Sequence, residues 1–160
     1  MIHHPVHKQE FFSYLSKDCQ DALAAFAAQN FHAEEGEIQS LWFKDGTPRR
    51  IVLFGLGDNK KWNERKYPLI ARRLVQYAKK ERIKDFAVCL PSDFLTDIKD
   101  IFKQFAVNAH MAAFDFDIYK EKQKTSRAVE SIFLGHSAHA HSALDKAIAE
   151  GMIIGEEVNE

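Results

Sequence analysis

Short apolar runs and longer amphipathic segments alternate along this chain from residue 37 to its last residue. The short runs are rich in β-branched and aromatic residues, as strands are, and the longer segments repeat apolar residues at helical spacing. The expected strands are residues 37–44, 50–55, 84–90 and 127–135, and the expected helices are residues 18–29, 63–81, 93–112 and 137 onward. This alternation predicts an α/β fold, with helices on both faces of a mostly parallel or mixed sheet.

Local signals refine these boundaries. Residues 45–48 (Asp-Gly-Thr-Pro) are a turn signal, so the first two strands are expected to pair as a hairpin. Pro68 suits the first turn of a helix better than its interior, which places the start of that helix near Tyr67. Ser92 is the expected N-cap of the next helix. Residues 1–17 have no clear periodicity and stay unassigned.

Length and composition exclude several classes of protein. A chain of 160 residues is expected to form one domain, and 46% apolar with 28% charged residues is ordinary for a globular protein. A net charge of −1 does not steer the chain toward nucleic acid or an anionic membrane. Cys19 and Cys89 are expected to be reduced thiols, and no signal peptide or membrane-spanning run is visible. These features together predict a cytoplasmic protein.

Gly55-Leu56-Gly57 follows a strand and precedes a helix, which is where α/β folds bind phosphate through free backbone N–H groups. The third glycine of a dinucleotide fingerprint is missing, and Asp58 would place a negative charge beside the phosphates. We favour an ordinary turn that needs glycine for its backbone angles. The alternative is a free-standing macro-like module that binds ADP-ribose or a nucleotide at this turn.

Basic residues gather between positions 60 and 84, and on a helix several of them fall opposite the apolar stripe. The stripe is Ile70, Leu74, Tyr77 and Ala78, and the basic residues opposite it are Arg65, Arg72, Arg73, Lys79 and Lys80. Because no aromatic residues interleave with them for base stacking, a solvated or partner-facing surface is favoured over a nucleic-acid footprint.

Other candidate chemistry is sparse. His136 and His139 would share one helix face and could bind a metal ion, but neither cysteine nor a nearby carboxylate completes a ligand set. Asp115 and Asp117 are interpreted as solvated charges. There is no G-x-S-x-G nucleophile motif. The residues themselves therefore assign no catalytic, cofactor-binding or metal-binding position.

Four segments in this order resemble the N-terminal domain of the leucyl aminopeptidase (cytosol aminopeptidase) family. They are RIVLFGLGD (50–58), KDFAVCLP (84–91), FDFDIYKEK (114–122) and AIAEGMIIGEEVNE (147–160). The resemblance covers about residues 37–160, and its order and spacing are more specific than any single segment. One departure is that residues 11–15 are the only candidate for an earlier strand.

The resemblance implies a macro-domain-like N-terminal domain at residues 1–136, followed at residues 137–160 by the start of a linker helix toward a C-terminal catalytic domain. The full-length protein would be a metallopeptidase that releases N-terminal amino acids from peptides, using two divalent metals (zinc or manganese) in that catalytic domain. This domain would aid assembly of a homo-oligomer, the family hexamer. Neither nucleic acid nor membrane is an expected partner, and this chain by itself is not expected to be an enzyme.

The last helix carries an apolar face that continues to the end of the chain. Its residues are Leu144, Ala147, Ile148, Gly151, Met152, Gly155 and Val158. Two glycines inside a helix cost roughly 1 kcal/mol each relative to alanine, so they predict close packing or a local break. We expect this face to lie against a second module that the chain does not contain.

Overall fold

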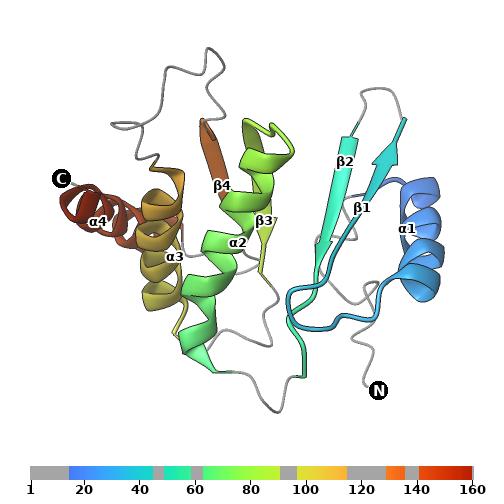
Figure 1. Cartoon of the computed structure of the whole chain (residues 1–160), viewed down its shortest axis with the longest axis horizontal. Coiled ribbons are helices and arrows are strands. Elements are labelled where there is room, and N and C mark those ends of the chain that lie inside the picture. Colours follow the sequence, from blue (N-terminus) through green and yellow to red (C-terminus); the bar gives the residue numbers. More distant parts are fainter. Residues whose placement is uncertain are drawn as a thin grey trace. The chain divides into compact units, whose positions relative to one another are not determined.

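The chain divides into two compact units, Met1–Trp62 and Asn63–Glu160. The structure is a computed structural model, and it describes residues 15–44, 49–58, 63–90, 97–114, 129–135 and 141–159. The first unit contains α1 (Lys17–Asn30), β1 (Ile38–Phe43) and β2 (Arg49–Phe54). The second contains the 3-10 turn η4 (Glu64–Lys66), α2 (Tyr67–Lys80), β3 (Asp85–Cys89), α3 (Ile98–Ala113), β4 (Ser131–Gly135) and α4 (His141–Asn159) (Figure 1).

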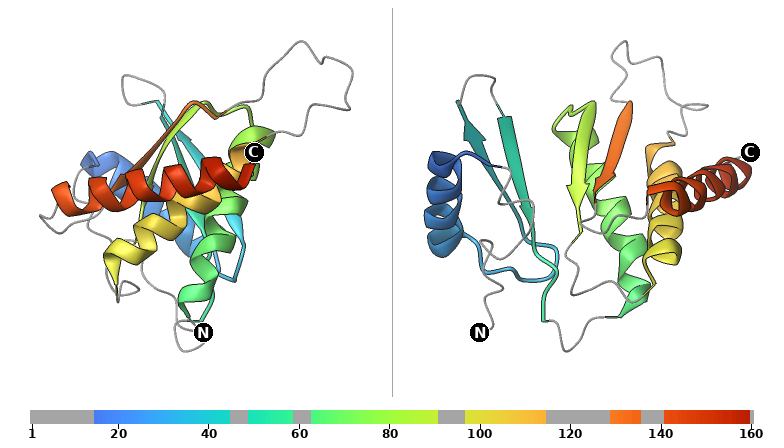
Figure 2. Two further views of the ribbon diagram at one scale, coloured as in Figure 1. Left: turned by 90° about the vertical axis from the view of Figure 1, so that its left-hand side faces the viewer. Right: turned by 180° about the vertical axis from the view of Figure 1, so that it is seen from behind.

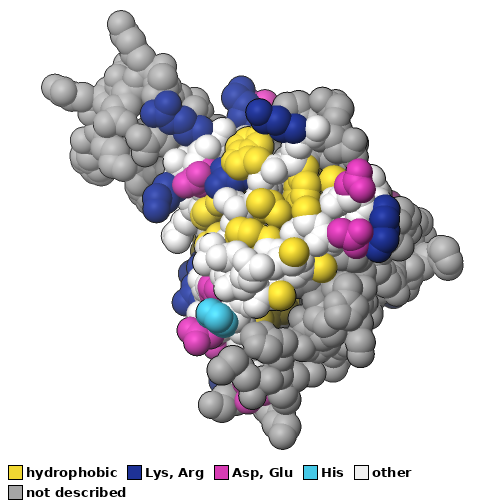
Figure 3. All heavy atoms as spheres, turned by 90° about the vertical axis from the view of Figure 1, so that its right-hand side faces the viewer, with side chains coloured by type: hydrophobic (Ala, Val, Ile, Leu, Met, Phe, Trp, Pro, Cys, Tyr) yellow, Lys and Arg dark blue, Asp and Glu magenta, His cyan; other side chains and the backbone are white. Residues whose placement is uncertain are grey.

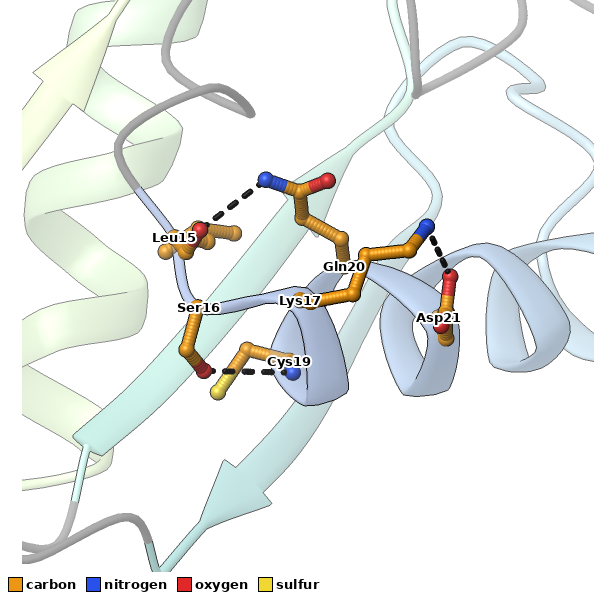
Figure 4. A network of polar contacts seen from close by, with 6 residues as sticks. All are labelled: Leu15, Ser16, Lys17, Cys19, Gln20 and Asp21. Carbon is orange, nitrogen blue, oxygen red and sulfur yellow. Dashed lines mark hydrogen bonds and ion pairs between the residues drawn. The ribbon is translucent and has the colours of Figure 1, made fainter.

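α1 begins at a hydrogen-bonded cap. The Ser16 hydroxyl accepts a hydrogen bond from the backbone N–H of Cys19, which satisfies one of the free amides of the first turn (Figure 4). In the next turn Lys17 and Asp21 form an exposed i, i+4 ion pair with 2.8 Å between Nζ and Oδ1. The start of α1 is therefore fixed by local contacts.

The first unit packs α1 against an antiparallel hairpin of β1 and β2, whose register runs from Ile38 opposite Phe54 to Phe43 opposite Arg49. The hairpin prediction is confirmed, although the predicted turn at residues 45–48 lies outside the described residues. Its core is formed by Cys19, Leu23, Ala27, Phe31, Phe43 and Leu53. Figure 3 looks onto the α1 side of this unit and shows a patch of apolar side chains with charged side chains around it.

In its described residues the second unit has three α-helices and a parallel pair of strands. β3 and β4 pair in parallel, from Asp85 opposite Ser131 to Cys89 opposite Gly135. α3 packs against both α2 and α4 and lies between them (Figure 2). Its side chains supply much of the core, with Phe102 and Phe105 almost fully buried. Strands of both orientations therefore occur in the chain, and the expected mixed α/β class is confirmed.

Local sequence signals located α2 better than α3. α2 begins at Tyr67, and Pro68 occupies its first turn as expected. Its buried face is rotated slightly from the predicted stripe, since Leu74 and Tyr77 are only half-buried and the fully buried residues are Tyr67, Ile70, Ala71, Val75 and Ala78. The predicted N-cap Ser92 was wrong for α3. Its cap is Asp97, whose carboxylate accepts from the backbone N–H groups of Lys99 and Asp100.

Candidate functional site

The turn at Gly55–Gly57 is held by the loop that precedes β1. The N–H of Gly55 donates to the carbonyl of Glu37 at 2.8 Å, and the N–H of Gly57 donates to the carbonyl of Ala33 at 3.0 Å. In return, the N–H of Gly36 donates to the carbonyl of Gly55 at 2.9 Å. Two amides that a phosphate would need therefore already have partners within the chain.

Glycine is required at both positions of the turn, for two different reasons. A Cβ added to Gly55 would lie 1.9 Å from the carbonyl oxygen of Glu34, which is too close for any side chain. Gly57 has a φ of +79°, a left-handed conformation that glycine adopts without steric cost. This geometry favours the structural interpretation of the turn over a phosphate cradle, which would need free amides at a helix start.

The side-chain carboxylate of Glu37 binds two backbone amides of the loop that precedes it. Its Oε2 accepts hydrogen bonds from the backbone N–H of His32 at 2.9 Å and of Glu34 at 3.2 Å. Between them Ala33 has a φ of +56°, and successive amides in such a conformation form a concave anion-binding nest. The carboxylate of Glu37, which belongs to the chain itself, therefore occupies this nest. The sequence analysis gave Glu37 no role beyond the start of a strand, because residue spacing does not indicate which backbone amides a carboxylate binds.

Two of the basic residues of α2 also contact α3: Arg72, which is exposed as predicted, and Lys79, which is half-buried. Nε of Arg72 donates to Oδ1 of Asn108 on α3 at 2.9 Å. Nζ of Lys79 donates to the carbonyl oxygens of Ala112 and Ala113 at 3.0 Å and 2.9 Å. The Lys79 ammonium thus binds the free carbonyls at the C-terminus of α3, where a positive charge is favourable. Both side chains connect α2 to α3, so their role is structural.

Arg65, Arg73 and Lys80 are exposed, as the helical periodicity predicted. They remain candidates for a partner-facing surface. The other three basic residues of the 60–84 group that the structure describes are Lys66, which is half-buried, and Arg82 and Lys84, which are exposed.

The apolar face predicted for the last helix is divided between two environments. Ala147, Gly151 and Gly155 are buried, and both glycines lie against α3, so the partner of this part of the face is within the chain. A Cβ on Gly151 would lie 2.5 Å from the carbonyl oxygen of Lys103. The expectation that a separate module covers these glycines was therefore wrong. The side chain of Leu144 lies outside the described residues, and the exposed large apolar residues are Met152, Ile153, Ile154 and Val158.

The remaining candidates supply no assembled site within the described part of the chain. His136, His139, Asp115 and Asp117 all lie outside the described residues. Among residues that are described, no three His, Cys, Asp or Glu side chains are grouped to bind a metal ion. Nor does any described helix combine the length and apolar character needed to cross a bilayer.

Both cysteines are free thiols. Cys19 is buried in the core of the first unit, whereas Cys89 lies at an exposed position of β3. Partial burial nevertheless raises the pKa of the Cys89 thiol, because the protein around it disfavours the thiolate. The Cys89 thiol therefore lacks the lowered pKa of an activated nucleophile.

Comparisons with a family model and with solved structures both find a match for this chain. The family model described as the cytosol aminopeptidase family, N-terminal domain, matches residues 4–123. Among solved structures, a mutant of tomato leucine aminopeptidase has a similar fold, with a TM-score of 0.73 and 20% sequence identity. The match covers 94% of this chain but only 30% of the tomato chain.

No curated protein sequence matches the chain. The family model nevertheless spans three quarters of it, and the fold agrees along nearly its whole length. The chain therefore belongs to the cytosol aminopeptidase family, and the matched residues form the N-terminal domain of that family.

Proposed function

We propose that this chain is the non-catalytic N-terminal domain of a leucyl aminopeptidase-like enzyme and aids the assembly of that enzyme. The observation that carries the proposal is the match to the N-terminal domain of the family over residues 4–123. The fold match points the same way, since almost all of this chain corresponds to less than a third of tomato leucine aminopeptidase.

Catalysis in the full-length protein belongs, in this proposal, to a C-terminal domain that holds two divalent metals, zinc or manganese. Such metals supply a hydroxide nucleophile and polarise the peptide carbonyl, so that N-terminal amino acids are released from peptides. No residue of this chain is assigned a catalytic or metal-binding role. Its proposed contribution is to the assembly of the enzyme.

The proposed partners follow from the same reading. The domain is joined to its own catalytic domain through α4, whose buried glycines fix the helix on α3. It assembles as part of a homo-oligomer, the family hexamer. The protein is cytoplasmic, and neither nucleic acid nor a membrane is among its partners. Peptides are substrates of the full-length enzyme and do not bind to this domain alone.

Activity assays on two versions of the protein test the proposal. The 160-residue chain, supplied with Mn²⁺ or Zn²⁺, should release no leucine from leucine p-nitroanilide above the rate with metal alone. A protein extended by the coding sequence that follows Glu160 should hydrolyse the same substrate, and a chelator should abolish that activity. Hydrolysis by the 160-residue chain, or a downstream sequence without a metallopeptidase region, would refute the proposal.

Deleting residues 1–136 from the extended protein tests the assembly role. The truncated protein should contain fewer subunits than the intact one, as its sedimentation mass divided by its own subunit mass will show. If the truncated protein keeps the same oligomeric state, the domain has no part in assembly.

A further inference from the structure

The outward side of α4 carries an apolar strip that ends in two acids. Ala149, Met152 and Ile153 are exposed and lie three and four residues apart, so they are neighbours on one side of the helix. Met152 is 51% and Ile153 58% exposed. One turn further on, Glu156 and Glu157 are also exposed. We call these five residues the α4 strip.

The outward side of α2 carries a strip with the opposite charge. Leu69 is 50% exposed, Arg73 one turn after it is exposed, and Arg65, in the 3-10 turn η4 just before the helix, is exposed as well. Lys80 continues the same side of the helix, and there is no acidic residue anywhere in α2. We call these four residues the α2 strip.

The two strips match in spacing as well as in charge. In the α4 strip Glu157 lies four residues after Ile153, and in the α2 strip Arg73 lies four residues after Leu69. A parallel alignment of the two helices would therefore bring Leu69 against Ile153 and Arg73 against Glu157. Burying two exposed large apolar side chains is favourable, and complementary charges beside them select this register.

We propose that the α4 strip of one copy of this chain docks on the α2 strip of a second copy. The contact joins two different surfaces, so each copy keeps one strip available for a further copy. Such a head-to-tail contact closes into a ring or continues as a chain, and its charged part weakens as salt is added. The inference concerns the 160 residues alone, and it stands or falls independently of any catalytic domain downstream.

Sedimentation velocity on the 160-residue chain tests the contact. At low salt the mean mass should rise with protein concentration, and about 0.5 M salt should reverse that rise. Arg73→Glu and Glu157→Lys should each weaken self-association about tenfold, because each places like charges together. The double variant R73E/E157K restores an opposite-charge pair and should recover association to within about threefold of the original chain.

Lys99→Glu is the matched control, since it makes the same charge change at an exposed position of α3 outside both strips. It should leave association unchanged, and circular dichroism should show all variants folded. A chain that stays monomeric at the highest soluble concentration overturns the proposal. So does a double variant that associates no better than either single one, because the two side chains are then not partners.

Discussion

Nε of Arg72 donates a hydrogen bond to Oδ1 of Asn108 and so links α2 to α3. Asn108 is only 5% exposed, and its Nδ2 donates to the carbonyl of Gln104 at 2.8 Å. It is the one buried polar side chain among the described residues. The arginine, by contrast, is exposed and can turn to water if its partner is removed.

This asymmetry predicts which substitution costs more. Arg72→Met leaves the Asn108 oxygen buried without its partner, and we expect unfolding free energy to fall by about 1–3 kcal/mol. Asn108→Leu removes the buried polar group itself and should cost less, about 1 kcal/mol. Urea unfolding followed by circular dichroism at 222 nm measures both. The reverse order would mean that the hydrogen bond contributes little to the packing of α2 on α3.

Gly151→Ala should destabilise the second unit although alanine is the better helix former. The new Cβ would lie 2.5 Å from the Lys103 carbonyl oxygen and 2.9 Å from the Ala106 Cβ, so α4 must move away from α3. We expect a net loss of about 1–3 kcal/mol, against a gain of about 1 kcal/mol from helix propensity alone. The same urea experiment measures the loss. The control is Ala149→Gly at an exposed position of α4, which should lose only the propensity term; a stabilised Gly151→Ala variant would contradict the close packing.

Gly55→Ala should disrupt the first unit more than Gly57→Ala does. At Gly55 the clash is with backbone, 1.9 Å from the Glu34 carbonyl oxygen, and the loop cannot retract without losing its hydrogen bonds to the turn. We expect a loss of about 3 kcal/mol or more there, and about 1–2 kcal/mol for the left-handed position at Gly57. Tryptophan fluorescence reports this unit, because Trp42 lies on β1. Equal effects of the two substitutions would argue against the close approach of turn and loop.

The Cys89 thiol should react slowly at neutral pH. Partial burial raises its pKa above the ordinary value of 9.0, and only the thiolate attacks disulfide reagents. In a Cys19→Ser variant, the rate with a disulfide reagent should therefore keep rising at pH values beyond 9.0. The folded chain holds this proton more tightly than the unfolded chain does. Its contribution to stability is thus complete below pH 9.0 and is lost as pH rises through the folded pKa. A rate that levels off below pH 9 would show that burial does not act on the thiol.

Binding of ADP-ribose at Gly55–Gly57 is not expected, because the N–H groups of both glycines donate to carbonyls of the preceding loop. Titration calorimetry with ADP-ribose should give only the heat of dilution. Saturable heat would instead show that the loop can release the turn to a ligand.

Periodicity sufficed for the order of elements from residue 37 onward, because strands and helices differ in how their apolar residues repeat. Pro68 located the start of α2 because its ring restricts one backbone angle whatever surrounds it. The resemblance to the cytosol aminopeptidase family was readable from four segments for a different reason, since it depends on their order rather than on any contact.

Contacts between distant segments were beyond the reach of sequence patterns. Arg72 and Asn108 are 36 positions apart, and periodicity identifies the face of a helix without identifying its neighbour. The same limit applies to the candidate turn. Its need for glycine could be inferred, but the cause is the approach of Glu34, more than 20 residues earlier. On α4 the apolar face was recognised, yet nothing in its spacing indicated that Gly151 faces α3.

The hydrogen bonds between the Gly55–Gly57 turn and the loop at Ala33–Glu37 have an evolutionary consequence. Each segment supplies the other's hydrogen-bond partners, so a change in the backbone of one segment removes partners from the other. Insertions, deletions and bulky replacements in the two stretches should be inherited as matched pairs, and related genes should show the two stretches varying in step.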